Sequence, residues 1–404
     1  MRRPAAAILT AVAVTAVAAA SPAPKGPPPA PKGLPLAAPA PSHSASCGFS
    51  ASLPAVSKHA TSLPWAQQVL NLPGAWQLSQ GRGITVAVID SGADAVPQLA
   101  GRVAAVNLTS ARPADCDGHG TEVASIIAAS RQPGTAFAGV APQARILAIK
   151  VQNGEQSQAG QGTGLVAQAI QLAVARGARV INMSLQSSQD NPVLRSAVRY
   201  AISHRVVVVS AAGNDKIIHG KKLTGPFYPA SYPGVLSVGA VASDGSPWAG
   251  TDAFSRAGVS APGVYVTSAA PGGYVVNQLV GTSYAAPFAA GVAALILSLH
   301  PQLTPAEVVA KIDGTANGGT GPGTGAGLIS PLNALTAVQL STGPTASPQP
   351  AGPPVAVRRP PPPDRPARDT ALAITAAALI LAAAIVIAGL AIPAARRRRR
   401  PAGP

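Results

Sequence analysis

Short apolar runs rich in β-branched residues alternate with longer helical patterns through the middle of this chain. The alternation is typical of a parallel sheet covered by helices on both faces, because successive parallel strands need a crossover connection. We therefore expect one compact α/β domain over about residues 60–340. The predicted strands are Ile84–Ile89, Ile146–Val151, Val180–Met183, Val206–Ser210 and Val235–Val238. The predicted helices are Thr121–Ala129, Gly164–Arg176, Pro192–His204, Ser283–Leu299 and Thr304–Ile312.

Polar residues follow two of the predicted strands. In open sheets of this kind, ligands bind beyond the carboxyl ends of the strands. Asp90 ends the run 84–89 and is followed by a glycine two residues later, so its carboxylate could orient a second group or close the strand as an Asx-turn. Asn214 follows the strand 206–210, and its side-chain amide could stabilise an oxyanion or form an ordinary turn.

Glycines flank a histidine and precede a serine at the starts of two predicted helices. His119 lies between Gly118 and Gly120, which lets the backbone bend and leaves the ring exposed in a cleft. Ser283 lies at a helix N-terminus, where unpaired N–H groups and the dipole favour a developing oxyanion, although an ordinary N-cap serine is the alternative. We expect Pro287 in the first turn of that helix, where its missing N–H costs little.

The order Asp, His, Ser and the residues around them resemble the subtilisin family of serine proteases over about residues 75–340. The stretch 182–185 and the closing segment 325–334 belong to the same resemblance. It implies a subtilisin-like parallel sheet with Ser283 as nucleophile, His119 as general base and acid, and Asp90 as the carboxylate that fixes the imidazole tautomer. It also implies that Asn214 and the Ser283 N–H stabilise the oxyanion.

The resemblance further implies a substrate cleft beside Ser184, Leu185 and Gln186, in which extended substrate backbone pairs by strand addition. Gln186 replaces the glycine that usually follows Ser-Leu in subtilisins, and Glu122 and Ser125 stand where His and Gly are common. Substrate preference therefore does not carry over from the family. The segment 130–137 lacks the Asn-rich loop that binds calcium in many subtilisins, so we expect no metal there, and we expect no cofactor.

Both ends of the chain carry apolar segments that indicate export and anchoring. Residues 1–20 combine two arginines, an apolar run and a small-residue site, as in a signal peptide. Residues 371–392 carry no charge and are long enough to cross a hydrocarbon core of about 30 Å, with a buried helical hairpin as the alternative. Arg396–Arg400 in the tail 393–404 then favour a cytoplasmic C-terminus and an extracellular domain.

Residues 21–59 and 341–370 are dominated by Pro, Ala and Ser and predict an extended N-terminal extension and an extended linker. The two cysteines of the chain are Cys47 in the extension and Cys116 near His119, and an even count in an exported chain favours a disulfide. The formal net charge is +16, but seven basic residues lie in the signal and tail. The others are scattered, which argues against a nucleic-acid surface.

This architecture resembles the mycosins, the membrane-bound proteases attached to actinobacterial type VII secretion systems. The resemblance implies a single-pass protease that cleaves exported proteins beside the secretion complex at the cytoplasmic membrane. It implies that a Cys47–Cys116 bridge joins the extension to the catalytic face. A structural role in stabilising the secretion complex, with proteolysis secondary, is the alternative, and a general nutrient protease is a third interpretation.

Overall fold

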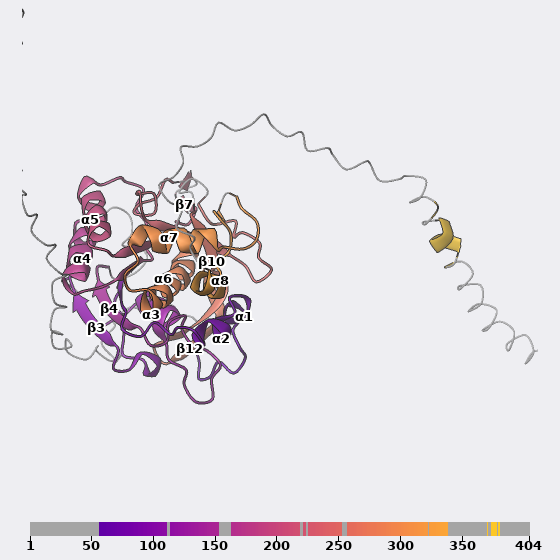
Figure 1. Cartoon of the computed structure of the whole chain (residues 1–404), viewed down its shortest axis with the longest axis horizontal. Helices are drawn as coiled ribbons and strands as arrows, with labels where there is room; N and C mark the ends of the chain where they lie inside the picture. Colours follow the sequence, from indigo (N-terminus) through magenta and orange to yellow (C-terminus); the bar gives the residue numbers. More distant parts are fainter. Residues whose placement is uncertain are drawn as a thin grey trace, which may run out of the picture. The chain divides into compact units, whose positions relative to one another are not determined.

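The computed structural model describes residues 56–110, 114–152, 163–218, 221–223, 225–252, 257–321 and 323–337, together with residues 370, 373–377 and 379 (Figure 1). The chain divides into two units, residues 1–339 and 340–404. In the second unit, the described residues are helical and exposed. The first unit holds the folded domain and all the helices and strands discussed below.

The centre of the domain is a parallel sheet of seven strands in the order β10-β9-β6-β5-β2-β4-β3. The α/β prediction is therefore confirmed. The strands are β2 (Thr85–Asp90), β3 (Val103–Asn107), β4 (Arg145–Lys150), β5 (Val180–Met183), β6 (Val207–Ala211), β9 (Leu236–Val241) and β10 (Val259–Pro262).

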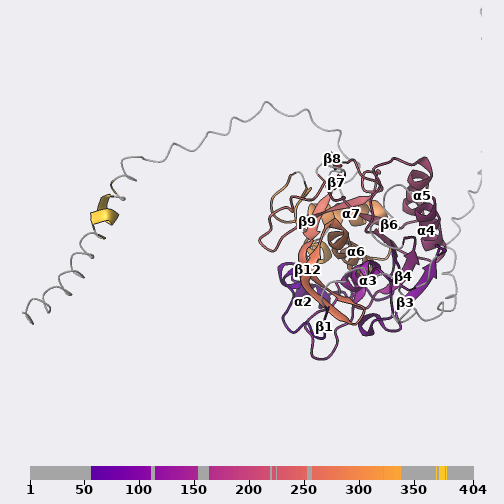
Figure 2. The same ribbon diagram turned by 180° about the vertical axis from the view of Figure 1, so that it is seen from behind.

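Helices cover both faces of this sheet (Figures 1 and 2). Alternate residues of β2 serve the two faces, as the two-residue period of a strand requires: Val86 and Val88 pack on one side, and Ala87 and Ile89 on the other. The first face is covered by α3 (His119–Ala128) and α6 (Thr282–Leu299). The second is covered by α4 (Thr163–Ala175) and α5 (Pro192–Ser203).

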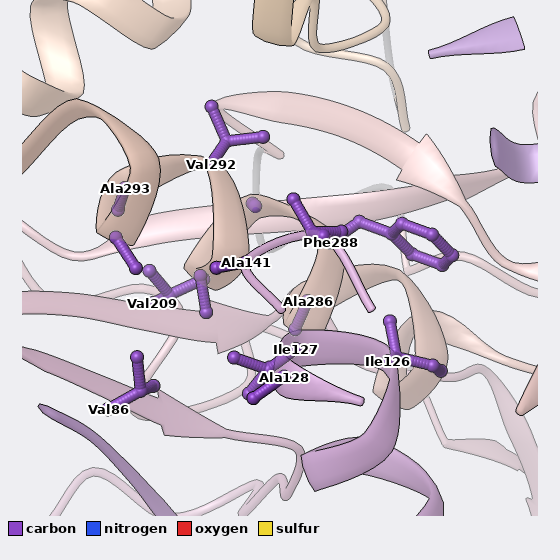
Figure 3. Close-up of a cluster of buried hydrophobic side chains, with 14 of the residues drawn as sticks. Val86, Ile126, Ile127, Ala128, Ala141, Val209, Ala286, Phe288, Val292 and Ala293 are labelled. Atoms are coloured by element: carbon purple, nitrogen blue, oxygen red, sulfur yellow. The ribbon is translucent and has the colours of Figure 1, made fainter. Parts of the chain in front are cut away.

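The α6 helix lies in the core beside α3. Figure 3 shows Ala286 and Phe288 of α6 near Ile127 and Ile126 of α3, with Val209 of β6 in the same cluster. Among the described residues, α6 is the one helix long and apolar enough to cross a membrane, but 83% of its apolar window is buried inside the domain. Its composition therefore reflects a core position. The predicted span 371–392 lies largely outside the described residues.

Smaller elements complete the domain. An antiparallel sheet joins β1 (Val56–Ser57), β12 (Gly273–Val280) and β11 (Val264–Ala270), so the end of the predicted extension 21–59 pairs with the folded domain. The remaining elements are α1 (Trp65–Val69), α2 (Leu72–Trp76), a short 3-10 helix (Pro97–Leu99), the hairpin β7 (Lys216–Ile218) and β8 (Lys221–Leu223), α7 (Pro305–Gly314) and α8 (Pro331–Thr336).

Candidate active site

The candidate residues gather at the carboxyl edge of three neighbouring strands, β6, β5 and β2. Asp90 is the last residue of β2, Ser184 is the first residue after β5, and Asn214 is the third residue after β6. The chain places β3 and β4 on one side of β2 and later strands on the other, so the strand order reverses at β2. Crevices form at such a reversal, because the connections leave the sheet in opposite directions.

A hydrogen bond of 2.8 Å joins Asp90 Oδ1 to His119 Nδ1, and both side chains are buried. Because an ionised carboxylate only accepts, the proton lies on Nδ1 and leaves Nε2 as the acceptor of a neutral ring. The backbone N–H of Ser91 donates to the same Asp90 oxygen at 2.7 Å. Within the described part of the chain, His119 Nε2 has no hydrogen-bond partner, so it is available to take a proton.

The charge of Asp90 makes His119 a stronger base. Burial of the ring lowers the pKa of His119, but the charge and the hydrogen bond of Asp90 raise it, with smaller contributions from Glu122 and Asp117. The net direction is a pKa above the ordinary value of 6.5. A proton taken by this imidazole is therefore held more firmly than it would be by a free histidine.

A second buried carboxylate, Asp115, holds the His119 loop against the end of β2. Its oxygens accept hydrogen bonds from Ser91 Oγ at 2.8 Å, Gly118 N at 3.0 Å, Thr121 N at 2.8 Å and Thr121 Oγ1 at 2.6 Å. Ser91 Oγ in turn accepts from the N–H of Gly120 at 2.9 Å. A side chain at Gly120 would overlap the carbonyl oxygen of Gly92, which explains the glycine after the histidine.

The serine lies in the first turn of α6, as expected. The N-cap residue, Gly281, has φ of 143°, a region that favours glycine, and a Cβ there would lie 3.3 Å from Asn214 Nδ2. Ser283 is the second residue of the helix, so its N–H has no partner four residues earlier within the helix. That N–H and the positive end of the helix dipole favour negative charge beside the serine.

The prediction that Pro287 lies in the first turn is wrong. The helix begins at Thr282, so Pro287 is its sixth residue and lies inside it. A residue there would normally donate its N–H to the carbonyl of Ser283, four residues earlier. Because proline lacks the donor, that carbonyl accepts from Ser184 Oγ at 2.6 Å, and Ser184 Oγ accepts from Asn182 Nδ2 at 3.0 Å. The backbone of the serine is thus tied to β5.

Only one of the two hydrogen bonds of a catalytic relay is formed. Ser283 Oγ donates to the carbonyl of Ser184 at 3.4 Å rather than to His119. The histidine is nevertheless close by, because the ring of Tyr284, the next residue, lies 5.2 Å from the His119 ring between centroids. Catalytic hydrogen bonds are often long or poorly aligned without substrate, so this geometry is compatible with a relay that completes on binding.

The side chain of Asn214 has one end fixed and one end free. Its Oδ1 accepts from Thr282 N at 3.1 Å and from Thr282 Oγ1 at 2.7 Å. Its Nδ2 donates to no other described residue and faces Gly281 at the start of α6. Thr282 therefore orients the amide so that its N–H groups and the N–H of Ser283 can serve a common acceptor.

The three residues predicted to bind substrate are largely engaged within the protein. Ser184 is fully buried, and its hydroxyl is used by Asn182 and Ser283. Leu185 is also buried. Gln186 is half-buried, and its side chain bonds the backbone of Asn214. These contacts place the segment beside the serine.

Sequence reasoning noted Glu122 as a departure from the family but missed its role in the site. Its carboxylate is buried and accepts from Tyr284 OH at 2.9 Å. Burial raises the pKa of Glu122 to about 7, against the opposing effects of His119 and of the Tyr284 hydrogen bond. The signal in the sequence was its spacing of three residues from His119, which puts both side chains on one face of α3.

Among the described residues, no group of three His, Cys, Asp or Glu side chains could hold a metal ion, and no cysteine is a free thiol. Cys116 is one of the described residues, while Cys47 lies outside them, as do the predicted signal peptide 1–20 and tail 393–404.

Comparison with known proteins identifies the family of the folded domain. The model of the subtilase family of peptidases matches residues 81–333, more than half of the chain. The chain belongs to the subtilase family. This subtilase is therefore a serine protease homologue of the subtilisins. It is 35% identical over 233 residues to thermitase of Thermoactinomyces vulgaris, covering 56% of this chain and 79% of thermitase.

The solved structures that resemble this subtilase include two mycosin proteases. The MycP3 protease from the type VII (ESX-3) secretion system is 34% identical, with a TM-score of 0.62, and the match covers 70% of this chain and 92% of that structure. MycP1, a serine protease described as an essential component of the type VII (ESX-1) secretion system, is 32% identical, with a TM-score of 0.64 and coverage of 70% and 92%.

Proposed function

We propose that this subtilase is a membrane-anchored endopeptidase of the mycosin type that cleaves exported proteins at a type VII secretion system. The observation that carries the catalytic part is the buried hydrogen bond of 2.8 Å between Asp90 and His119, on the strand edge that also carries Ser184 and Asn214. Ser283 is attached to that edge through the Ser184 hydroxyl. The similarity to MycP3 and MycP1 supports the secretion-linked part.

In the proposed reaction, Ser283 Oγ attacks the carbonyl carbon of the scissile peptide bond while His119 Nε2 takes its proton. Asp90 holds the imidazole in the required tautomer and stabilises its positive charge. Asn214 Nδ2 and the Ser283 N–H donate to the developing oxyanion, and one such donor is worth about 2.7–4 kcal/mol of transition-state stabilisation. His119 then protonates the leaving amine, and water releases the acyl group by the same steps in reverse order.

A serine-directed fluorophosphonate tests the catalytic assignment. We expect it to label the protein at Ser283 and expect Ser283→Ala to abolish both labelling and peptide hydrolysis. Ser188→Ala is the matched control, because Ser188 is an exposed serine five residues after β5. The Ser188→Ala variant should be labelled as fully as the parent protein. Labelling that persists in Ser283→Ala would refute the assignment.

The proposed topology places a cleaved signal at residues 1–20 outside the mature protein and a single membrane span at 371–392, with the basic tail in the cytoplasm. Support comes from the described part of that span, where residues 373–377 are helical and Ile374 and Leu379 are 66% and 67% exposed. Apolar side chains exposed on a helix are compatible with a lipid environment. Truncation after residue 369 should release an active protease into the medium; retention in the membrane fraction would count against the span.

We further propose that Cys47 pairs with Cys116, which stands three residues before His119. The absence of free thiols among the described residues supports it. Mass analysis of peptides digested without reduction should recover the two cysteines in one species, and recovery of unpaired, alkylated Cys116 would contradict the bridge.

A structural role is the second candidate function, because MycP1 is described as an essential component of its secretion system as well as a protease. Secretion in a strain carrying Ser283→Ala should be compared with secretion in a deletion strain. A secretion defect confined to the deletion would support a stabilising role, and equal defects would leave proteolysis as the function.

A further inference from the structure

The side chain of Gln186 makes two hydrogen bonds to the backbone of Asn214. Its Oε1 accepts from the Asn214 N–H at 2.6 Å, and its Nε2 donates to the Asn214 carbonyl at 3.2 Å. One amide group thus satisfies both main-chain polar groups of a residue 28 positions away in the sequence. This is the pair of bonds that a neighbouring strand would make.

The other side of this backbone is already paired. Asp252 N donates to the Gly213 carbonyl at 2.9 Å, and Asp215 N donates to the Gly250 carbonyl at 2.8 Å. Asn214 is therefore opposite Thr251 in a narrow antiparallel bridge, with its own N–H and C=O directed away from that partner. Gln186 occupies the side they face, so the segment 213–215 is held from both sides.

The backbone on both sides of Gln186 is held in place by its neighbours. Leu185 before it is buried, and Ser187 after it exchanges two hydrogen bonds of 2.8 Å with Tyr228. The Gln186 side chain therefore links two fixed segments, 185–187 and 213–215, by hydrogen bonds. A glycine at this position, the residue that the subtilisin pattern leads one to expect, would leave the Asn214 N–H and C=O without this partner.

The position of the Asn214 backbone decides where its free amide nitrogen lies. Thr282 fixes only the Oδ1 end of the side chain, so a shift of the backbone pivots Nδ2 about that anchor. An oxyanion donor must lie within a few tenths of an ångström of its working position, and displacements near 1 Å can cost about 10²-fold in rate.

We infer that Gln186 is a positioning residue for the oxyanion donor: it clamps the backbone of Asn214 so that Nδ2 is preorganised for the transition state. The inference rests on the proposed catalytic role of Asn214. It assigns to Gln186 a task distinct from substrate contact. The clamp carries no charge, so it adds no electrostatic repulsion to the oxyanion that Asn214 is proposed to stabilise.

A double-mutant cycle on the full-length protein in detergent tests the clamp. Gln186→Ala should lower kcat on a peptide substrate about tenfold while KM changes less than about twofold, because a transition-state donor is misplaced. In the Asn214→Ala background, the same change should lower kcat less than about twofold, since no donor remains to position. Gln186→Glu, which keeps the shape but loses the donor to the Asn214 carbonyl, should lower kcat in the same pattern.

Gln189→Ala and Gln189→Glu are the matched controls, because Gln189 is an exposed glutamine on the same loop, and its backbone rather than its side chain bonds the neighbouring Ser187 hydroxyl. They should leave kcat unchanged. An equal loss from Gln186→Ala in both backgrounds, or a loss seen only in KM, would overturn the inference while leaving the protease assignment intact. A parent protein that neither hydrolyses peptide nor reacts with the fluorophosphonate would remove the proposed function and the inference with it.

Discussion

The two halves of the candidate site are built from different chemistry. On the base side, His119 is surrounded by ionisable groups: Asp90 holds its ring, Asp115 holds its loop, and Glu122 lies on the same helix. On the nucleophile side, the side chains of the described residues that hydrogen-bond Ser283 or Asn214 are all neutral. The proposed proton acceptor is thus surrounded by charge, whereas the proposed oxyanion donors are positioned by hydrogen bonds from neutral groups. The geometry of the base side should respond to pH, and that of the nucleophile side should not.

Loss of Asp115 should show the largest effect, because it leaves four donors unsatisfied at a buried site. We expect Asp115→Ala to lower the free energy of unfolding by about 4 kcal/mol. Urea unfolding followed by tryptophan fluorescence in a Ser283→Ala background, which prevents autolysis, measures it. Asp244→Ala is the control, since Asp244 lies in an exposed turn and its carboxylate accepts from the N–H and hydroxyl of the nearby Ser246. A midpoint shift no larger than that of the control would show that charge does not hold the base side.

Asn214→Ala tests the neutral half directly. It should lower kcat by about 10²–10³, equivalent to about 2.7–4 kcal/mol, because one oxyanion donor is lost. The loss should be the same fold at every pH where the parent protein is active, since the amide does not titrate. Asn333→Ala is the control, because it changes an exposed asparagine on α8 that is not among the candidate site residues. It should leave kcat unaltered. A loss that grew or shrank with pH would break the proposed division.

The stability of Glu122→Gln relative to the parent protein, measured as a function of pH, tests whether the base side responds to pH. Burial raises the pKa of Glu122 from 4.5 to about 7 in the folded protein. As the pH rises, the unfolded chain therefore loses the Glu122 proton at a lower pH than the folded protein does. The contribution of Glu122 to stability is therefore complete below pH 4.5 and is lost as the pH rises through about 7. The shift corresponds to about 3 kcal/mol, so the stability of Glu122→Gln relative to the parent should rise by up to that amount between pH 4 and pH 8.

The control for this measurement is Glu307→Gln on α7. The hydrogen bonds of Thr304 hold the pKa of the exposed Glu307 below its usual value, so the parent protein gains stability from Glu307 as the pH rises. The stability of Glu307→Gln relative to the parent protein should therefore fall with rising pH, whereas that of Glu122→Gln should rise. If both glutamine variants followed the same pH dependence, the burial argument for Glu122 would fail.

The smallest effect is expected from Ser184→Ala in the neutral half. It removes the hydroxyl between Asn182 and the Ser283 carbonyl, and we expect the free energy of unfolding to fall by about 1 kcal/mol. Ser210→Ala is the matched control, because Ser210 is a buried serine near the end of the neighbouring strand β6 that bonds only an adjacent carbonyl. Equal costs for the two would mean that the bond to Ser283 contributes nothing of its own.

Much of this fold could be predicted because its signals are local. The five predicted strands and five predicted helices are present, with ends displaced by at most three residues. The pairing of Asp90 with His119 was predicted from the resemblance of their two short glycine-containing motifs to the subtilisin family, since neither motif alone decides it. The strands β3 and β10 were missed, since Val103–Asn107 and Val259–Pro262 are short and carry small residues that resemble loop sequence.

Contacts between distant segments could not be predicted in the same way. Gln186 was predicted to bind substrate, and nothing in the sequence indicates that its amide reaches Asn214, because that contact depends on how two loops leave adjacent strands. The burial of Glu122 is also a property of the packed structure, where Tyr284 of α6 closes over α3. The prediction for Pro287 was wrong because this residue is already the fifth of a helix that begins at Ser283, beyond the first turn of 3.6 residues. The observed start at Thr282 makes it the sixth.

That proline has a mechanical consequence. Since Pro287 cannot donate to the Ser283 carbonyl, the first residues of α6 are fastened to the sheet while the rest of the helix packs in the core. Flexing of α6 beyond the proline is therefore expected to leave the attacking hydroxyl in register with the strand edge. Motion of the C-terminal part of α6 is then expected to be transmitted only weakly to Ser283.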